Sequence, residues 1–329
     1  MFHLHAYKGR PAFRSEEQGG EQAVTTQPLK QPRFTGKLSP HARLFGTGEV
    51  TSQIRCTVIA AHPGDEIVGA GFLISKLDDI SVVHVTDGAR DLQVARDAGF
   101  EDLASYAAAR KKECRDALAL ARVSEDRIIE FSVPDTSAFE CLIDLTKRIA
   151  YHLQQSGAEI VVTHPYEGGH PDHDATAFAT NAALQLMAQN GCKPPTLFEM
   201  ALHPGDDDVS KVPEFLPSTE GETTTLVLDQ SAIDLKRRML GCLKSQERSI
   251  QSSPLGYEKF RMPPQYDFTA PPQEGKLHYE NFDWAPRSVE WLTRARKAMK
   301  DLFSSGKADA DSMQNSLYIS RSDPPDKSH

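Results

Sequence analysis

Apolar residues occur along the chain in short runs that alternate with stretches of helical spacing. Each run is long enough for a buried strand, and between the runs apolar residues recur every three or four positions, as on one face of a helix. Strands that alternate with helices of this length indicate βαβ units, so we expect an α/β fold with a mainly parallel sheet flanked by helices. The predicted strands cover residues 55–62, 80–87, 127–133, 159–164 and 196–202, and the predicted helices cover residues 66–77, 101–121, 139–155 and 174–187.

This alternation stops after residue 206. A strand is predicted there at 224–229, followed by a helix at 231–247 and a last helix at 288–302. The stretch at 252–286 is rich in proline and aromatic residues. It could line a substrate cleft, cover an edge of the sheet or contact another subunit.

Neither an internal repeat nor a clear linker divides the chain, so we expect one domain at 51–303. Its core would cover residues 55–201, and residues 207–303 would form a C-terminal elaboration. Residues 1–50 are rich in Gln, Gly, Pro and Thr without an apolar period, which predicts an extended or disordered N-terminal arm. Residues 304–329 are equally polar and are expected to be a tail.

Composition narrows the classes of function. The 329 residues carry a net charge of -9, so no basic excess favours binding to nucleic acid. The five cysteines contain no CxxC pair, a pattern typical of reduced thiols in a cytosolic protein. We find neither a signal peptide nor a run of about 18 apolar residues, and we expect a soluble, cytoplasmic protein. The oligomeric state stays open, a homo-oligomer included.

Two polar segments follow predicted strands. The sequence HPGDE begins at His62, after the first strand, and GGHPDH at 168–173 comes after the fourth. In an open parallel sheet, ligands bind beyond the carboxyl ends of the strands, at the point where the strand order reverses. We therefore expect these two segments to lie side by side although they are far apart in the chain.

The residue types in these segments suit a divalent metal. His62, Asp65 and His173 together offer two imidazoles and one carboxylate, and three protein ligands leave one position open, as in catalytic zinc sites. Such an ion lowers the pKa of its water from about 15.7 towards about 7 and polarises a carbonyl oxygen. A histidine in a loop is more often an ordinary polar residue, and the tetrad HPGD recurs at 203–206 without a helical pattern after it. The first copy has the strand, the helix and the partner segment that a metal site needs.

Five motifs in order carry a family resemblance. They are VIAAHPGDEIVGAG at 58–71, VTDG at 85–88, RKKE at 110–113, Pro134-Asp135 and THPYEGGHPDHDA at 163–175. Over residues 55–201 the chain resembles the LmbE-like, or PIG-L, family of zinc-dependent N-acetylglucosaminyl deacetylases. The resemblance implies a Rossmann-like α/β sheet and zinc ligands at His62, Asp65 and His173.

The resemblance also implies roles for residues around the metal. His170 would act as a cation that stabilises the oxyanion or protonates the leaving amine, and Asp172 would orient His170. Arg110 and Asp135 match positions that hold the sugar. Two simpler readings stay open: Arg110 could pair with Glu113 on its own helix, and Asp135 could cap the helix that follows it.

One position departs from the family. The usual pattern is AHPDDE, in which the first Asp is the base that deprotonates the zinc-bound water, and here that position is Gly64. General-base help is worth about 10²–10⁴-fold in rate. Another carboxylate (Asp172, Glu66 or Glu167) could supply the base, the metal alone could acidify the water and give a slower enzyme, or the chain could bind metal and ligand without turnover.

The sequence therefore predicts a zinc-dependent hydrolase that removes an N-acetyl group from an amino sugar of the N-acetylglucosamine type. Another divalent metal could replace Zn²⁺, because imidazole and carboxylate ligands suit several ions. Two alternatives stay open: a zinc- and glycan-binding relative with weak or no catalysis because of Gly64, and a metal-free α/β binding protein. A GxGxxG turn, a P-loop and a GxSxG elbow are all missing, so the sequence does not support nucleotide binding or serine hydrolase chemistry.

Overall fold

One sheet of seven strands organises the protein. The computed structural model describes residues 39–46, 53–202, 214–216, 223–250, 253 and 255–304, which all belong to the compact unit that begins at Leu38. The strand order is β3-β2-β1-β4-β5-β7-β6. The first five strands in the chain run parallel, and β7 and then β6 add to β5 in antiparallel pairs. The strands are β1 (Arg55–Ala60), β2 (Asp79–Thr86), β3 (Ile128–Val133), β4 (Ile160–Thr163), β5 (Thr196–Met200), β6 (Thr223–Val227) and β7 (Tyr257–Arg261).

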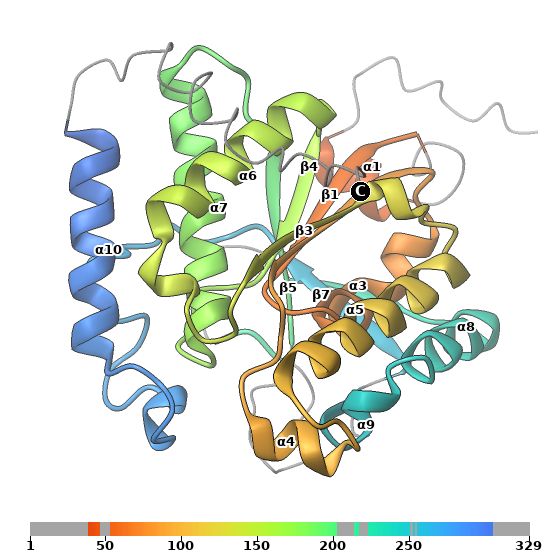
Figure 1. The fold of residues 1–329 in the computed structure, drawn as a ribbon. Helices are drawn as coiled ribbons and strands as arrows, with labels where there is room; N and C mark the ends of the chain where they lie inside the picture. Colours follow the sequence, from red (N-terminus) through yellow and green to blue (C-terminus); the bar gives the residue numbers. More distant parts are fainter. Residues whose placement is uncertain are drawn as a thin grey trace, which may run out of the picture. The chain divides into compact units, whose positions relative to one another are not determined.

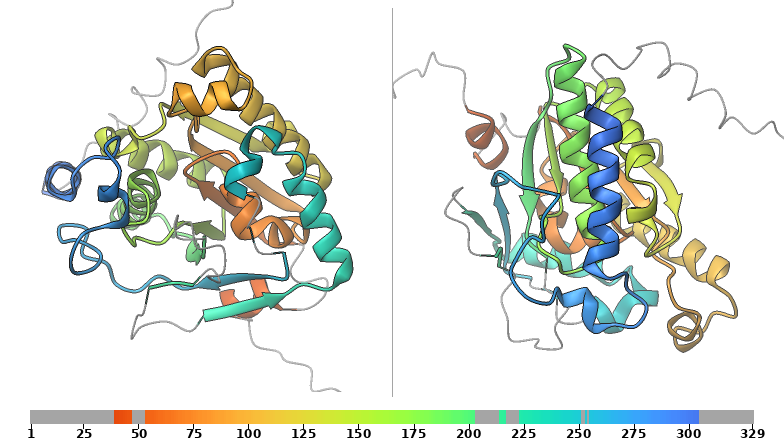
Figure 2. Two further views of the ribbon diagram at one scale, coloured as in Figure 1. Left: turned by 90° about the horizontal axis from the view of Figure 1, so that it is seen from below. Right: turned by 90° about the vertical axis from the view of Figure 1, so that its left-hand side faces the viewer.

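Helices cover both faces of the sheet (Figure 1). One face packs against α3 (Asp65–Ser75), α5 (Leu103–Leu120) and α8 (Gln230–Leu240). The other face packs against α6 (Leu142–Ser156), α7 (Pro171–Gln189) and α10 (Ser288–Phe303), and the two views of Figure 2 show the same two layers. Shorter elements connect these layers. They are α1 (Pro40–Phe45), α4 (Leu92–Asp97), α9 (Glu247–Ile250) and the 3-10 turns η1 (Glu125–Arg127), η2 (Ala138–Glu140), η3 (Lys244–Gln246) and η4 (His278–Asn281).

The continuous apolar runs of the sequence follow from this layering. In β1, Cys56, Val58 and Ala60 face the α3 and α5 side, whereas Ile59 faces the α6 and α7 side. Because both faces of the strand are buried, its residues do not alternate between apolar and polar. The α/β class with a mainly parallel sheet flanked by helices is confirmed.

The topology brings two strand ends together. After β1 the chain pairs β2 on one side of it, and later β4 on the other side. The strand order therefore reverses between β1 and β4, which is the place where ligands bind in such sheets. The residues that follow these two strands begin at Ala61 and at His164.

Some elements differ from expectation. Strand β7 lies in the proline- and aromatic-rich stretch, where no strand was predicted, since its buried Glu258 breaks the apolar pattern. Helix α4 was not predicted, and Pro40–Phe45 is helical although it falls in the expected arm. The rest of the expected arm before residue 39, the tail after 304 and the second HPGD tetrad at 203–206 lie outside the described residues. None of the helices within the described part of the chain is long and apolar enough to cross a membrane.

The buried Glu258 carboxylate accepts hydrogen bonds from backbone N–H groups of α3. Ala70 has φ −144° inside α3, and this kink frees backbone N–H groups. The N–H groups of Phe72 and Leu73 donate to the Glu258 carboxylate at 2.7 and 3.0 Å, and Lys236 Nζ on α8 donates to it at 2.9 Å. The side chains of Lys236 and Glu258 are both fully buried. This ion pair joins α3, α8 and β7.

We therefore predict that Lys236→Met destabilises the protein by about 3–5 kcal/mol, because it leaves the Glu258 carboxylate buried without a cation. Lys244→Met, at an exposed position on η3, is the control and should change the free energy of unfolding by less than about 0.5 kcal/mol. Denaturant unfolding measures both. Equal stability of the two variants would contradict the structural role of the pair.

Candidate metal centre

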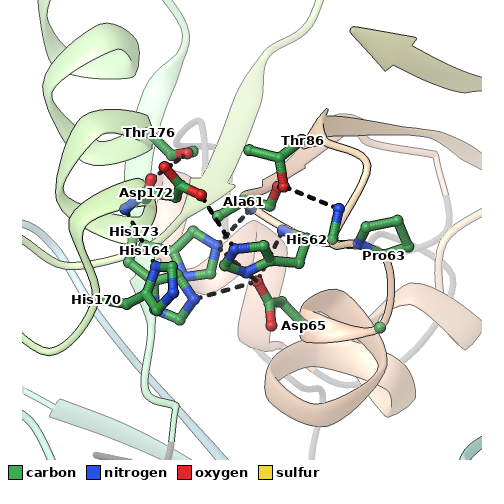
Figure 3. A network of polar contacts seen from close by, with 12 residues as sticks. Ala61, His62, Pro63, Asp65, Thr86, His164, His170, Asp172, His173 and Thr176 are labelled. Atoms are coloured by element: carbon green, nitrogen blue, oxygen red, sulfur yellow. Dashed lines mark hydrogen bonds and ion pairs between the residues drawn. The ribbon is translucent and has the colours of Figure 1, made fainter. Parts of the chain in front are cut away.

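The turn after β1 brings His62 and Asp65 together. His62 is buried, and Asp65 is the first residue of α3. Asp65 Oδ2 accepts the His62 backbone N–H at 2.9 Å and lies 3.1 Å from His62 Nδ1 (Figure 3). The carboxylate thus fixes both the turn and the ring of His62.

The segment after β4 approaches the same carboxylate oxygen. His173 Nε2, on the first turn of α7, lies 3.3 Å from Asp65 Oδ2. The rings of His62 and His173 are 5.2 Å apart between centroids. The two polar segments therefore lie side by side, as the topology argument expected. Burial alone raises the pKa of Asp65, but His173 and His62 outweigh it and hold this pKa well below its usual value.

His164 is a further member of this cluster that the sequence reading did not assign. Its Nε2 lies 3.5 Å from Asp65 Oδ2, and its ring stacks on that of His173 at 4.1 Å. Nε2 accepts the backbone N–H of Ala61 at 2.8 Å, so its lone pair is already used and it is a poor candidate for a metal ligand through that atom. His164 follows β4 as His62 follows β1, and that position was the available signal.

The carboxylate of Asp172 lies against His62, whereas its backbone N–H contacts His170, so the predicted orienting of His170 by Asp172 stays a prediction. Its Oδ2 is 3.3 Å from His62 Nε2, and the carboxylate accepts the backbone N–H groups of Thr136 at 2.6 Å and Ala138 at 3.1 Å. Asp172 is the second residue of α7, and its side chain is fully buried against the loop after β3 while its own N–H points to His170. A carboxylate behind the outer nitrogen of a histidine is typical of metal sites, where it orients the ring.

His170 forms the cap of α7 beside this cluster. Its Nδ1 accepts the Asp172 backbone N–H at 3.2 Å, which leaves the proton on Nε2. Its ring lies 4.7 Å from that of His62 and 5.1 Å from that of His173. Burial, and then the neighbouring His62 and His173, lower the pKa of His170 well below its usual value. The role of His170 as a cation stays a prediction.

Asp135 also reaches the cluster. Its Oδ1 is buried, lies 3.7 Å from His62 Nε2 and has no hydrogen-bond partner among the described residues. Burial raises the pKa of Asp135, but His62, Arg110 and Arg90 outweigh it and lower the pKa overall. The cap of the following turn η2 is Ser137, so the alternative that Asp135 caps the next helix is wrong. Substrate binding by Asp135 stays a prediction.

Arg110 is held by protein groups at the edge of the centre. Its guanidinium donates to the carbonyl oxygens of Gly88 and of Pro63, the latter at 3.0 Å, and to Gln246 Oε1 at 2.7 Å. These contacts join the loop after β1, the loop after β2 and η3. They favour a positioning role for Arg110, and its contact with a substrate stays a prediction.

Glu113 does not pair with Arg110, so that alternative is wrong. Its carboxylate instead accepts the N–H and the hydroxyl of Ser245, the hydroxyl at 2.6 Å. Ser245 and Gln246 on η3 thus bind the two ends of the RKKE motif on α5. The turn η3 therefore connects α5 to the loop that carries His62.

Comparison with known proteins shows which family this part of the chain resembles. Residues 57–184 match the family model PIG-L, described as GlcNAc-PI de-N-acetylase. These residues are therefore similar to the PIG-L family over about two fifths of the chain. The probable N-acetyl-alpha-D-glucosaminyl L-malate deacetylase 2 of Bacillus cereus is 31% identical to this chain over 135 residues. That alignment covers 40% of this chain and 60% of the relative, so the chain spans less than two thirds of the relative's length.

Solved structures share the fold at low identity. The A40926 pseudoaglycone deacetylase has a TM-score of 0.51 at 15% identity, and the match covers 64% of this chain and 96% of that one. The 4-carboxy-2-hydroxymuconate hydratase of Pseudomonas putida also has a TM-score of 0.51, at 17% identity, over 65% of this chain and 98% of that one. A deacetylase and a hydratase thus have the same fold. The fold alone does not select an activity.

Gly64 occupies the position of the usual PIG-L aspartate. Its φ is 112°, in the region that favours glycine, and its N–H donates to Glu66 Oε2 at 3.0 Å. A Cβ at this position would lie 3.1 Å from Gln246 Oε1 and 3.3 Å from a methyl group of Leu243. η3 and the residue before it therefore fill the space where a side chain at position 64 would begin.

The three carboxylates considered as replacement bases are engaged elsewhere. Glu66 is buried in the core, where Oε1 contacts Cys114 Sγ at 2.6 Å and His84 Nε2 at 3.2 Å. Glu167 pairs with Arg261 at 3.0 Å. Asp172 binds two backbone N–H groups and His62, as described above. None of these three places an unengaged carboxylate oxygen at the centre.

The donor set fits a divalent cation. His62, His170 and His173 offer ligand atoms within 4.8 Å of one another, and so do Asp65, His164 and His173. Among the members of these overlapping sets, His62, Asp65 and His173 combine two neutral donors with one anionic oxygen, a set that suits Zn²⁺. Their role as ligands stays a prediction that the geometry favours.

We predict that Gly64→Ala destabilises the protein by about 1–3 kcal/mol, because a side chain is strained at this φ and meets Gln246. Gly71→Ala on α3 is the matched control. Its Cβ would meet Met239 at an ordinary 3.6 Å, and alanine favours the helix, so stability should hold or rise. Denaturant unfolding of both variants decides, and an unchanged midpoint for Gly64→Ala would contradict the crowding at this turn.

Proposed function

We propose that this chain is a metal-dependent hydrolase that removes an N-acetyl group from an N-acetylglucosamine glycoconjugate. The observation that supports this proposal most is that ring nitrogens of His62 and His173 both lie close to Oδ2 of Asp65. The similarity to the PIG-L family and the printed activity of the Bacillus cereus relative support the same chemistry. Zn²⁺ is the ion we propose, because two imidazoles and a carboxylate suit it.

We propose that three residues hold the ion and that the residues behind them fix their orientation. His62 Nδ1, Asp65 Oδ2 and His173 Nε2 would hold the ion. When bound there, the ion polarises the amide carbonyl and lowers the pKa of a water molecule. Asp172 fixes the His62 ring from the opposite nitrogen, and Thr136 and Ala138 in turn fix Asp172.

His170 and Asp135 are the groups we propose to contact the substrate. The hydrogen on His170 Nε2 can be donated to the oxygen of the tetrahedral intermediate, an interaction that stabilises its negative charge. Asp135 has a carboxylate oxygen without a hydrogen-bond partner among the described residues, and this oxygen can accept a sugar hydroxyl. Because Gly64 supplies no base, we expect the water to be activated mainly by the ion, with slower turnover than a base would allow.

A second candidate function follows from Gly64. A relative that binds metal and glycan without turnover would keep the ligand set and lose the base, which is the combination found here. Measured turnover separates the two candidates.

The cellular location is also a proposal. All five cysteines are free thiols, and two of them, Cys56 and Cys114, are buried. This agrees with a reducing compartment, and we propose the cytoplasm.

We predict that the purified protein binds about one zinc ion per chain and releases amine from N-acetylglucosaminyl malate. His62→Ala, Asp65→Ala and His173→Ala should each lose both the ion and the activity, whereas His41→Ala, on α1, should keep both. Elemental analysis and an amine assay measure the two properties. Bound zinc without any release of amine would support the second candidate, and full activity in the three variants would refute the first.

His170→Gln provides a separate test of roles. If His170 contacts the reacting amide and is not a ligand, this variant should keep its zinc and its KM while kcat falls by about 10²–10⁴-fold. Loss of zinc from this variant would instead assign His170 to the ligand set with His62 and His173.

A further inference from the structure

The end of the proline- and aromatic-rich stretch returns to the candidate metal centre. The ring of Trp284, between η4 and α10, lies 5.3 Å from the ring of His170. The Trp284 ring also stacks on the ring of Phe282, with an interplanar angle of 20° and 5.3 Å between the ring centroids. Phe282 is exposed and Trp284 is half-buried. The two rings therefore form an aromatic surface that is open to solvent beside His170.

Arg90 lies on this surface. It belongs to the loop after β2, and its guanidinium carbon is 3.9 Å from the centre of the Trp284 ring, a cation–π contact. Among the described residues the guanidinium makes neither a hydrogen bond nor an ion pair, and its Nε is buried without an acceptor. The ring of Trp284 holds Arg90 in place, and although the charge of Arg90 acts on Asp135 from a distance, the N–H donors of its guanidinium stay available.

Arg110 provides the contrast. Both arginines lie near the centre, but Arg110 donates to two carbonyl oxygens and to Gln246. A buried N–H without an acceptor costs free energy, which a ligand oxygen can recover. Of the two arginines, Arg90 is therefore the one whose N–H donors can bind a ligand.

The positive charge and the planar shape of the Arg90 guanidinium indicate which kind of group binds there. With a net charge of -9, the protein repels anions at long range, so an anionic substrate needs a local cation. The planar fork of a guanidinium matches two oxygens of a carboxylate or a phosphate. We propose that Arg90 and Trp284 form a subsite for a carboxylate or phosphate group attached to the amino sugar. This inference rests on the proposed function, and it makes acidic glycosides of N-acetylglucosamine the preferred substrates.

The kinetic test compares three probes of different charge in the zinc-loaded protein. Methyl N-acetylglucosaminide is neutral, N-acetylglucosamine 1-phosphate carries a phosphate, and N-acetylglucosaminyl malate carries carboxylates. Arg90→Gln should raise KM about tenfold for an acidic probe, change it less than about twofold for the neutral one, and leave kcat nearly unchanged. Arg96→Gln, at an exposed position on the neighbouring helix α4, is the matched control and should behave as the parent protein. A larger effect on one of the acidic probes identifies which anion the subsite takes.

A binding test separates this inference from the proposed function. Trp284 and Trp291 are the two tryptophans of the chain, and Trp291 is fully buried. N-acetylglucosamine 1-phosphate should therefore quench the fluorescence of the parent protein whether or not it is hydrolysed. Trp284→Phe should abolish this signal, and Arg90→Gln should shift it to about tenfold higher ligand concentration.

The outcomes are distinct. If no probe is hydrolysed but the quenching depends on Arg90, the proposed function fails and the anion subsite stands. If Arg90→Gln changes KM equally for the neutral and the acidic probes, or if N-acetylglucosamine 1-phosphate leaves the parent fluorescence unchanged, the subsite is refuted.

Discussion

One oxygen atom, Oδ2 of Asp65, lies within 3.5 Å of ring nitrogens from His62, His164 and His173. A carboxylate in this position, largely removed from water, needs positive charge close by. A divalent cation shared with His62 and His173 would supply that charge and would leave His164 to accept its backbone hydrogen bond. The proposed ligands, the carboxylate of Asp172 behind His62 and the cap at His170 all surround this carboxylate oxygen.

The sheet makes this arrangement possible. Asp65 and His62 follow β1 and His173 follows β4, and these strands are neighbours at the point where the strand order reverses. The sequence was sufficient for this part, because apolar runs and helical spacing locate the strands and the general rule for parallel sheets locates the site. The convergence of the two polar segments needed no further information.

The contacts that the sequence did not reveal are long-range and polar. Asp172 was expected to serve His170, but the direction of its side chain depends on how α7 packs on the loop after β3. The contacts of Arg110 and Glu113 with Ser245 and Gln246 join segments more than a hundred residues apart, and spacing along one helix cannot predict them. Strand β7 was missed for a related reason, since Glu258 breaks the apolar pattern and only its partners on α3 and α8 explain its burial.

Because the same fold occurs in a deacetylase and in a hydratase, the activity proposed for this chain rests on its candidate metal centre and not on its fold. The most direct measurement is an anomalous X-ray difference map, recorded at the zinc edge, from crystals grown with zinc. We predict one peak about 2.0–2.2 Å from His62 Nδ1, Asp65 Oδ2 and His173 Nε2, with one side free of protein ligands. A map without a peak there, or with zinc bound instead by Glu66, His84 and Cys114, would contradict the account.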